Sequence, residues 1–455
     1  MIKVEGKSHW VQWLLWGVPV LWLVYMIVVH YPGVPTHDTD CQLREALSGV
    51  YNNWKPALYS YQLALFSKLA PGEEIGCSFI LQLLCFAAAV AIIAHHYSRV
   101  GLQYALLVAV LPLFFTVKGM LVTTVGNDEQ AAACYLLYIA MILRASALAG
   151  GKWRVMMVVA AWMILGYGLV LRHNAFPAVF LLSCWGAWRL GMRNRWRVAL
   201  VSICALGAAF GISCFWSYYV LESEPSYPLR SPLADDIVNI SILQGEWHPL
   251  MSDPPQKDIH QKVPPPVESC VFFPESGFSY SPLRPSYLYP EISQRLRDYE
   301  LLREAWWDIV SKNPGYYVIT KLFFFHQFLL EGRCLPWCSD MLKARFPHIT
   351  IGMDQASRHW RAWVNQGFVV MALVPLLCYL FLWMGVIKRV RQWVMADVVR
   401  IDAVVFVAVA FLYTSSFLLL VLSATEARYY IIRASLCCVG GSLLLLSLLH
   451  RRKKN

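Results

Sequence analysis

Ten long apolar runs constrain the fold more than any other feature of this chain. A run of about 20 apolar residues is long enough to cross the hydrocarbon core of a bilayer as one helix. Hydrophobic residues make up 58% of the 455 positions and charged residues only 15%, whereas soluble domains carry roughly 25% charged residues. We therefore expect an all-α polytopic membrane protein with spans at 11–29, 78–94, 102–117, 131–143, 155–171, 175–188, 198–220, 366–387, 403–423 and 430–449.

The predicted spans segregate the charges. With the N-terminus inside, the inside segments hold 18 Lys and Arg against three acids, Glu5, Asp397 and Asp402. The positive-inside rule then places both termini in the cytoplasm. The net charge of +11 is explained by this orientation in the membrane and implies no nucleic-acid partner. The first run is long for a signal-peptide core and lacks a small-residue cleavage pattern, so we expect it to remain as a span.

Two outer segments are much longer than the other connections, and we expect the second to be a folded or surface-lying outer domain. The first covers 30–76, and the second covers 221–365, a region that holds 16 of the 24 prolines. The chain therefore divides into an N-terminal transmembrane module at 1–220, an outer Pro-rich domain at 221–365 and a C-terminal transmembrane module at 366–455.

One apolar segment inside the outer domain is not predicted to span. Residues 315–330 contain Lys321 and His326, and a span there would move a strongly basic loop to the outside. We expect this segment to lie at the outer interface or to pack within the protein. Cys334 and Cys338 follow, with a three-residue spacing that is only a weak signal for a disulfide.

The first outer segment carries two carboxylates, Asp38 and Asp40, before a predicted helix near residue 41. A carboxylate at a membrane surface can accept the proton of an attacking hydroxyl, or it can bind a divalent metal. The alternative is structural: Thr39 and Gln42 have the spacing of a capping box, and the acids favour the helix dipole. The residues alone leave both interpretations open.

The other outer loops supply a further acid pair and several cations. Asp128 and Glu129 open the span at 131–143, while Arg172 and His173 lie on a very short third loop. A cationic pair so close to the bilayer can bind a phosphate. An Arg that snorkels to the interface is the alternative. The last outer loop adds Arg428.

Short motifs in these loops resemble bacterial members of the GT-C superfamily of membrane glycosyltransferases. They are Asp-Thr-x-x-Gln from Asp38 to Gln42, Lys55-Pro56 with Tyr59, Arg172-His173-Asn174, and Arg428-Tyr429-Tyr430 after a large outer loop. The likeness in topology covers most of the chain. Two positions depart from the pattern, since Lys55 stands where relatives often have His and Asn127 where they have Lys.

The resemblance implies inverting transfer of a sugar from a polyprenyl-phosphate donor to an envelope glycan, lipid or protein, on the outer side of the bacterial cytoplasmic (inner) membrane. It implies Asp38 as the base, with Asp40 as the competing choice, and a second acidic position at Asp128. A divalent metal (Mg or Mn), used by some relatives, would be held by these three. The expected site comprises catalytic Asp38, Asp40, Asp128 and Glu129, donor-phosphate ligands Arg172, His173, Arg428 and Lys55, and acceptor contacts Gln42, Asn174, Tyr59 and Tyr429.

Two functions from other classes fit the same sequence. A transporter or flippase for a lipid-linked sugar would use the same outer cations, but it also needs polar groups near the bilayer midplane, where the spans offer few. A non-catalytic scaffold would bind an envelope partner through the outer domain. In the glycosyltransferase interpretation, the outer domain helps to recognise the acceptor, and its tryptophans, such as Trp247, Trp306 and Trp307, could stack on sugar rings.

Overall fold

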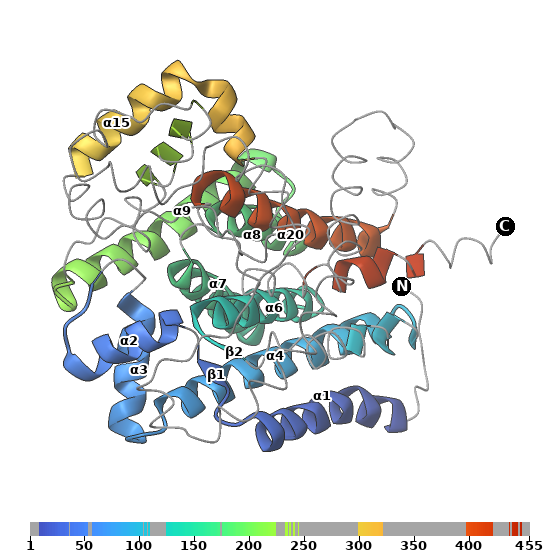
Figure 1. Ribbon diagram of the computed structural model, residues 1–455. Coiled ribbons are helices and arrows are strands. Elements are labelled where there is room, and N and C mark those ends of the chain that lie inside the picture. The colour runs from blue at the N-terminus through green and yellow to red at the C-terminus, as the bar shows by residue number, and fades with distance from the viewer. Residues whose placement is uncertain are drawn as a thin grey trace, which may run out of the picture. The chain divides into compact units, whose positions relative to one another are not determined.

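A computed structural model of the chain shows a mostly helical protein (Figure 1). It describes residues 9–35, 37–52, 57–102, 104–106, 108–109, 124–172, 175–223, 299–321 and 397–421, with scattered residues between 233 and 244 and between 436 and 447. The chain divides into two compact units. Unit 1 comprises Met1–Glu224, Cys334–Ser416 and Ala427–Asn455, and unit 2 comprises Pro225–Arg333 and Phe417–Glu426.

Unit 1 contains most of the described helices and one pair of very short strands. Its helices are α1 (His9–His30), α2 (His37–Ser48), α3 (Ala57–Leu69), α4 (Glu74–Ser98), α6 (Asn127–Ser146), α7 (Lys152–Leu171), α8 (Phe176–Arg189) and α9 (Arg195–Phe215), which continues into the π-helical turn η2 (Trp216–Val220). The strands are β1 (Val34–Pro35) and β2 (Thr124–Val125). Helix α20 (Val398–Val421) begins in this unit.

Four described helices are long and apolar enough to cross a membrane: Trp13–His30, Glu74–Ser98, Lys152–Leu171 and Arg195–Val220. They confirm the helices predicted at 11–29, 78–94, 155–171 and 198–220. Helix α8, predicted as a span, has only 14 residues, which is about 21 Å of helix against a hydrocarbon core of about 30 Å. The spans at 102–117, 366–387 and 430–449 lie largely outside the described residues, and the count of ten stays a prediction.

Helix α6 is the central helix of unit 1. Nearly all of its residues are buried between α4 and α7, and its alanines at 131–133 allow close packing there. At Gly168 of α7, a Cβ atom would lie 2.7 Å from the ring of Tyr135, whose hydroxyl donates to the Gly168 carbonyl at 2.9 Å. Helix α1 instead exposes Trp13 and Val28, each 76% exposed, as expected of a helix that faces lipid.

Unit 2 is built around a buried ion pair. Helix α15 (Tyr299–Lys312) buries Leu302, Ala305 and Ile309 at helical spacing. A short helix follows, and its Lys321 donates to Asp236 at 2.7 Å with both side chains buried. In the segment predicted at 315–330, Thr320 and Lys321 are buried, whereas Tyr316, Val318 and Ile319 are exposed. The rest of the segment, with His326, lies outside the described residues.

Burial raises the pKa of Asp236 above its ordinary value, although the Lys321 ammonium and the Trp306 indole act in the opposite direction. Trp306 donates its Nε1–H to Asp236 at 3.0 Å and packs edge-on against Tyr317. This tryptophan thus takes part in the interior of unit 2, whereas its neighbour Trp307 is 66% exposed. Of the two described tryptophans with a predicted sugar contact, only Trp307 has an exposed ring.

Candidate functional site

The two short strands join the first two predicted outer loops. Strands β1 and β2 pair in parallel, with Val34 opposite Thr124 and Pro35 opposite Val125. Gly33 makes this approach feasible: its φ is +88°, and a Cβ atom there would collide with the Val125 side chain and lie 2.8 Å from Phe79. Two segments about 90 residues apart in sequence therefore meet at one place.

Helix α2 begins beside this strand pair and carries the first two predicted catalytic carboxylates. It starts at His37, and the Thr39 hydroxyl donates to the carbonyl of Val125 at 2.5 Å. The capping box, the alternative interpretation of Thr39 and Gln42, is not formed, because the helix begins two residues before Thr39 and no described residue hydrogen-bonds to the Gln42 carboxamide. Thr39 instead attaches the start of α2 to β2.

The two carboxylates on α2 have different surroundings. Asp40 is fully buried, and one of its oxygens accepts from Arg44 at 2.5 Å one turn later. Asp38 is partly exposed. A proton acceptor must come within hydrogen-bond reach of its substrate, so the partly exposed Asp38 fits that role better than the buried Asp40.

Gln42 is a buried polar residue with no described partner. Its side chain is 0% exposed, and neither its amide nitrogen nor its oxygen has a hydrogen-bond partner in the described part of the chain. A buried unsatisfied amide costs about 1–3 kcal/mol. The burial of Gln42 does not test its predicted contact with the acceptor, which stays a prediction.

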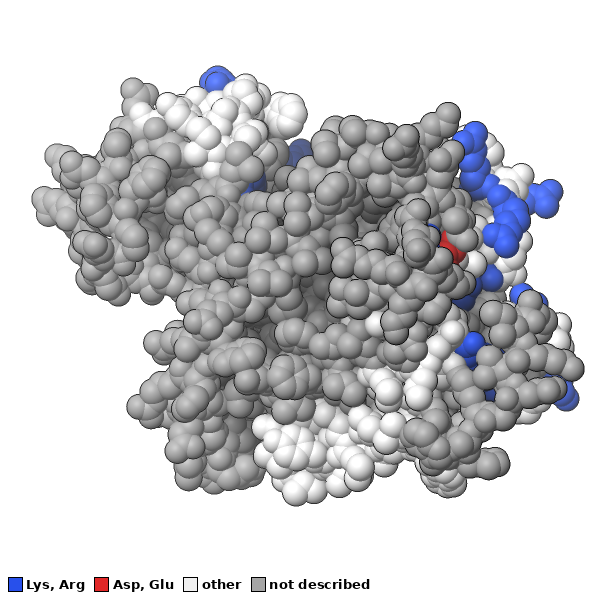
Figure 2. Space-filling view, turned by 90° about the vertical axis from the view of Figure 1, so that its right-hand side faces the viewer, with Lys and Arg blue, Asp and Glu red and all other residues white. Residues whose placement is uncertain are grey.

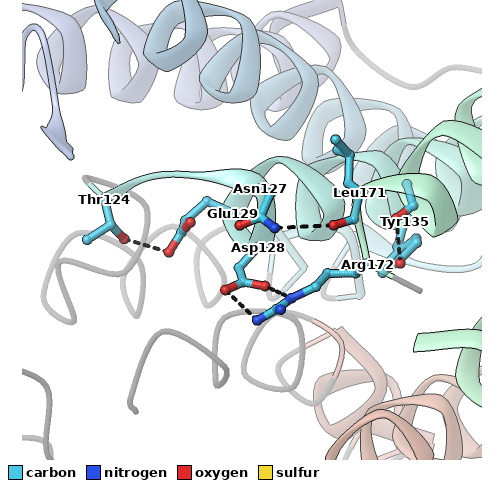
Figure 3. A network of polar contacts seen from close by, with 8 residues as sticks. Thr124, Asn127, Asp128, Glu129, Tyr135, Leu171 and Arg172 are labelled. Carbon is cyan, nitrogen blue, oxygen red and sulfur yellow. Dashed lines mark hydrogen bonds and ion pairs between the residues drawn. The ribbon is translucent and has the colours of Figure 1, made fainter. Parts of the chain in front are cut away.

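The start of α6 brings the second acid pair to the same strands (Figure 3). Asp128 is 1% exposed and accepts two hydrogen bonds from the Arg172 guanidinium, from Nε and, at 2.7 Å, from Nη2. Arg172 follows directly after α7, and Asn127 donates to the carbonyl of Leu171 at 3.3 Å. A predicted acid and a predicted phosphate ligand thus form one bidentate ion pair.

Glu129 points toward strand β2. Its carboxylate accepts from the Thr124 hydroxyl at 2.9 Å, and the Thr124 carbonyl accepts from Gln82 of α4 at 2.7 Å. Figure 3 shows Asp128 and Glu129 leaving the start of α6 in different directions, one toward Arg172 and one toward Thr124. The acid pair therefore connects β2 with the end of α7.

Tyr59 is part of a buried polar network. Its ring is fully buried, its hydroxyl lies 2.9 Å from that of Ser78, and burial raises its pKa above the ordinary value. Nearby, Gln62 and Gln130 exchange amide hydrogen bonds of 3.0 and 2.8 Å. These contacts fasten α3 to α4 and α6, and they give Tyr59 a packing role in place of the predicted acceptor contact.

Five of the predicted site residues lie outside the part of the chain that the structure describes. They are Lys55, His173, Asn174, Arg428 and Tyr429, and Cys334, Cys338 and Trp247 lie outside it as well. In the described part of the chain, no three His, Cys, Asp or Glu side chains are arranged to hold a metal ion. Asp38, Asp40 and Asp128 therefore do not form the predicted metal-binding group there.

Sequence reasoning missed the partners of a buried carboxylate at the other end of the helices, Asp402. Asp402 of α20 lies directly before the span predicted at 403–423, and it is fully buried. It accepts from Tyr97 of α4 at 2.8 Å and from Trp185 of α8 at 2.9 Å, and Arg189 lies 3.6 Å away. An acid at the start of an apolar helix was the available signal, because such a group needs partners.

No protein-family model matches the chain, and no curated protein or solved structure matches it either.

Proposed function

We propose that this protein is a membrane glycosyltransferase that transfers a sugar from a polyprenyl-phosphate donor to an acceptor hydroxyl of an envelope glycan, lipid or protein. One observation carries the proposal: the strand pair and Thr39 bring the start of α2, with Asp38, beside the start of α6, whose Asp128 holds Arg172. A base for the acceptor and a cation for a departing phosphate are the groups that such a transfer requires.

Asp38 is the proposed base. Its carboxylate accepts the proton of the acceptor hydroxyl while that oxygen attacks the anomeric carbon. The bond between the anomeric carbon and the phosphate oxygen breaks with its electrons remaining on the phosphate, so the products are the inverted glycoside and the polyprenyl phosphate. The partial exposure of Asp38 supports this assignment, whereas the full burial of Asp40 opposes the competing one.

Arg172 is the proposed phosphate ligand among the described residues, and Asp128 is its positioning residue. The bidentate contact fixes the plane of the guanidinium at the end of α7. Because Asp128 also neutralises part of the charge of Arg172, we expect Asp128 to tune donor affinity and to take no direct part in proton transfer.

The test compares turnover of purified Asp38→Asn with that of Asp397→Asn, using a polyprenyl-phosphate sugar and a hydroxyl acceptor. Asp397 is a partly exposed carboxylate just before α20, outside the proposed site. Loss of a general base costs about 100-fold or more in turnover, so we expect that loss in Asp38→Asn and near wild-type turnover in Asp397→Asn. Undiminished transfer by Asp38→Asn would remove the proposed base.

A further inference from the structure

The helices α7 and α9 begin with the same kind of sequence. Helix α7 starts Lys-Trp-Arg and α9 starts Arg-Trp-Arg. Arg154 of the first donates to the carbonyl of Leu190, in the connection between α8 and α9, at 3.0 Å. We call this surface the basic patch, and it consists of Lys152, Trp153, Arg154, Arg193, Arg195, Trp196 and Arg197.

The basic patch lies at the far end of α7 from the proposed site. Arg172 follows the last residue of α7 and Lys152 is its first. Twenty residues of α-helix separate the two by about 30 Å, close to the thickness of a bilayer core. The basic patch and the proposed site are therefore distinct, and the role of the patch does not depend on the proposed function.

Among the described residues, no ion pair offsets the positive charge of the basic patch. The sequence has no Asp or Glu between Glu129 and Glu222. Figure 2 shows Lys and Arg gathered along one side of the face that it draws, with a small acidic area among the described residues. Cations in the first turn of a helix also oppose the helix dipole, so an anion from outside would stabilise both helix starts.

The aromatic residues of the patch indicate where that anion comes from. Trp153 is 70% exposed and Trp196 is 74% exposed. The guanidinium carbons of Arg193 and Arg195 lie 5.2 and 5.7 Å from the ring centroids of Trp188 and Trp196, which holds these cations beside indole surface. Exposed Trp next to Lys and Arg at the end of a spanning helix is typical of the boundary between lipid tails and headgroups.

We propose that the basic patch binds the phosphate groups of anionic phospholipids in the leaflet at this end of α7 and α9. Both helices belong to the four that are long and apolar enough to span, so their first residues lie at a headgroup layer. The arginines contact lipid phosphates there, and the tryptophans lie beside the upper ends of the acyl chains. A dissolved anion would satisfy the charge but would leave the two indole rings in water.

The test measures phospholipid bound to the purified full chain in a neutral detergent by native mass spectrometry. Phosphatidylglycerol is the anionic probe and phosphatidylcholine the zwitterionic one. The patch variant is Arg193→Gln with Arg195→Gln and Arg197→Gln. A control variant removes three exposed cations elsewhere, through Lys68→Gln, Arg303→Gln and Lys312→Gln.

We expect the wild type and the control variant to bind phosphatidylglycerol equally and in preference to phosphatidylcholine. The patch variant should bind it about 100-fold more weakly, which corresponds to about 1 kcal/mol for each Arg removed. Arg→Lys at the same three positions keeps the charge and should retain most of the binding, which separates loss of charge from loss of folding.

Three results would overturn the proposal. Equal phosphatidylglycerol binding by the patch and control variants would show that these arginines are not the site. Equal binding of the two lipids by the wild type would remove the preference for negative charge. Thermal protection by inorganic phosphate as large as that by phosphatidylglycerol, at equal concentration, would identify a site for a dissolved anion.

Discussion

The ion pair of Asp128 and Arg172 allows the packing of the proposed site to be tested by a double-mutant cycle. The side chains are 1% and 15% exposed, and removing one partner of a buried pair costs about 3–5 kcal/mol because the other charge stays buried without compensation. Arg172 keeps some contact with water, so we expect about 3 kcal/mol, the lower end of that range, for Asp128→Asn and for Arg172→Gln. The double variant should lose little more than either single variant.

The assay is equilibrium unfolding of the purified protein in mixed micelles, followed by loss of helical circular dichroism. Asp308 and Lys312 supply a control cycle, since they form an exposed pair at 2.8 Å, one turn apart on α15. We expect a coupling energy of about 2–3 kcal/mol for the buried pair and below about 0.5 kcal/mol for the exposed one. Additive losses at Asp128 and Arg172 would refute the bidentate pair as a stabilising contact of the native state.

Two further predictions concern stability. Gly33→Ala should destabilise the protein by about 1–3 kcal/mol more than Gly49→Ala. Both glycines have a positive φ, but only a Cβ atom at Gly33 would meet neighbouring atoms. Equal losses of stability in thermal unfolding would contradict the close approach of β1 and β2. Lys321→Met should lower the free energy of unfolding by about 3 kcal/mol at pH 7 and by much less near pH 4. Removal of Lys321 raises the pKa of Asp236 further, so that protonation in acid abolishes the unpaired charge of Asp236. A loss of stability that does not depend on pH would contradict this prediction.

Much of the helical framework was predictable from the sequence. The spans at 11–29, 78–94, 155–171 and 198–220 were found because length and hydropathy alone decide whether a helix can cross a bilayer. The start of α6 was also expected within a few residues, since Asp128 and its neighbour mark a helix N-terminus.

The contacts between distant segments were not predictable. Strands of two residues, β1 and β2, are too short to produce an alternating pattern, and so their pairing left no local signal. A capping box was one of the two interpretations left open near Asp38, yet the Thr39 hydroxyl binds a carbonyl 86 residues away. Tertiary contact therefore replaced the local capping pattern.

The roles of individual charges depended on packing in the same way. Sequence position suggested Arg172 as a phosphate ligand and Asp128 as an acid, but it could not show that they form a pair. Asp402 was expected directly before a predicted span, but a single sequence does not reveal that Tyr97 and Trp185, from two other helices, converge on it.

Product analysis with a radiolabelled polyprenyl-phosphate sugar in proteoliposomes tests the central claim most directly. If the start of α2 and the start of α6 form a glycosyl-transfer site, the wild-type protein will release polyprenyl phosphate and form a glycoside of inverted anomeric configuration, and Asp38→Asn will form almost none. Movement of the intact donor across the bilayer with no glycoside formed would contradict the account and favour a flippase.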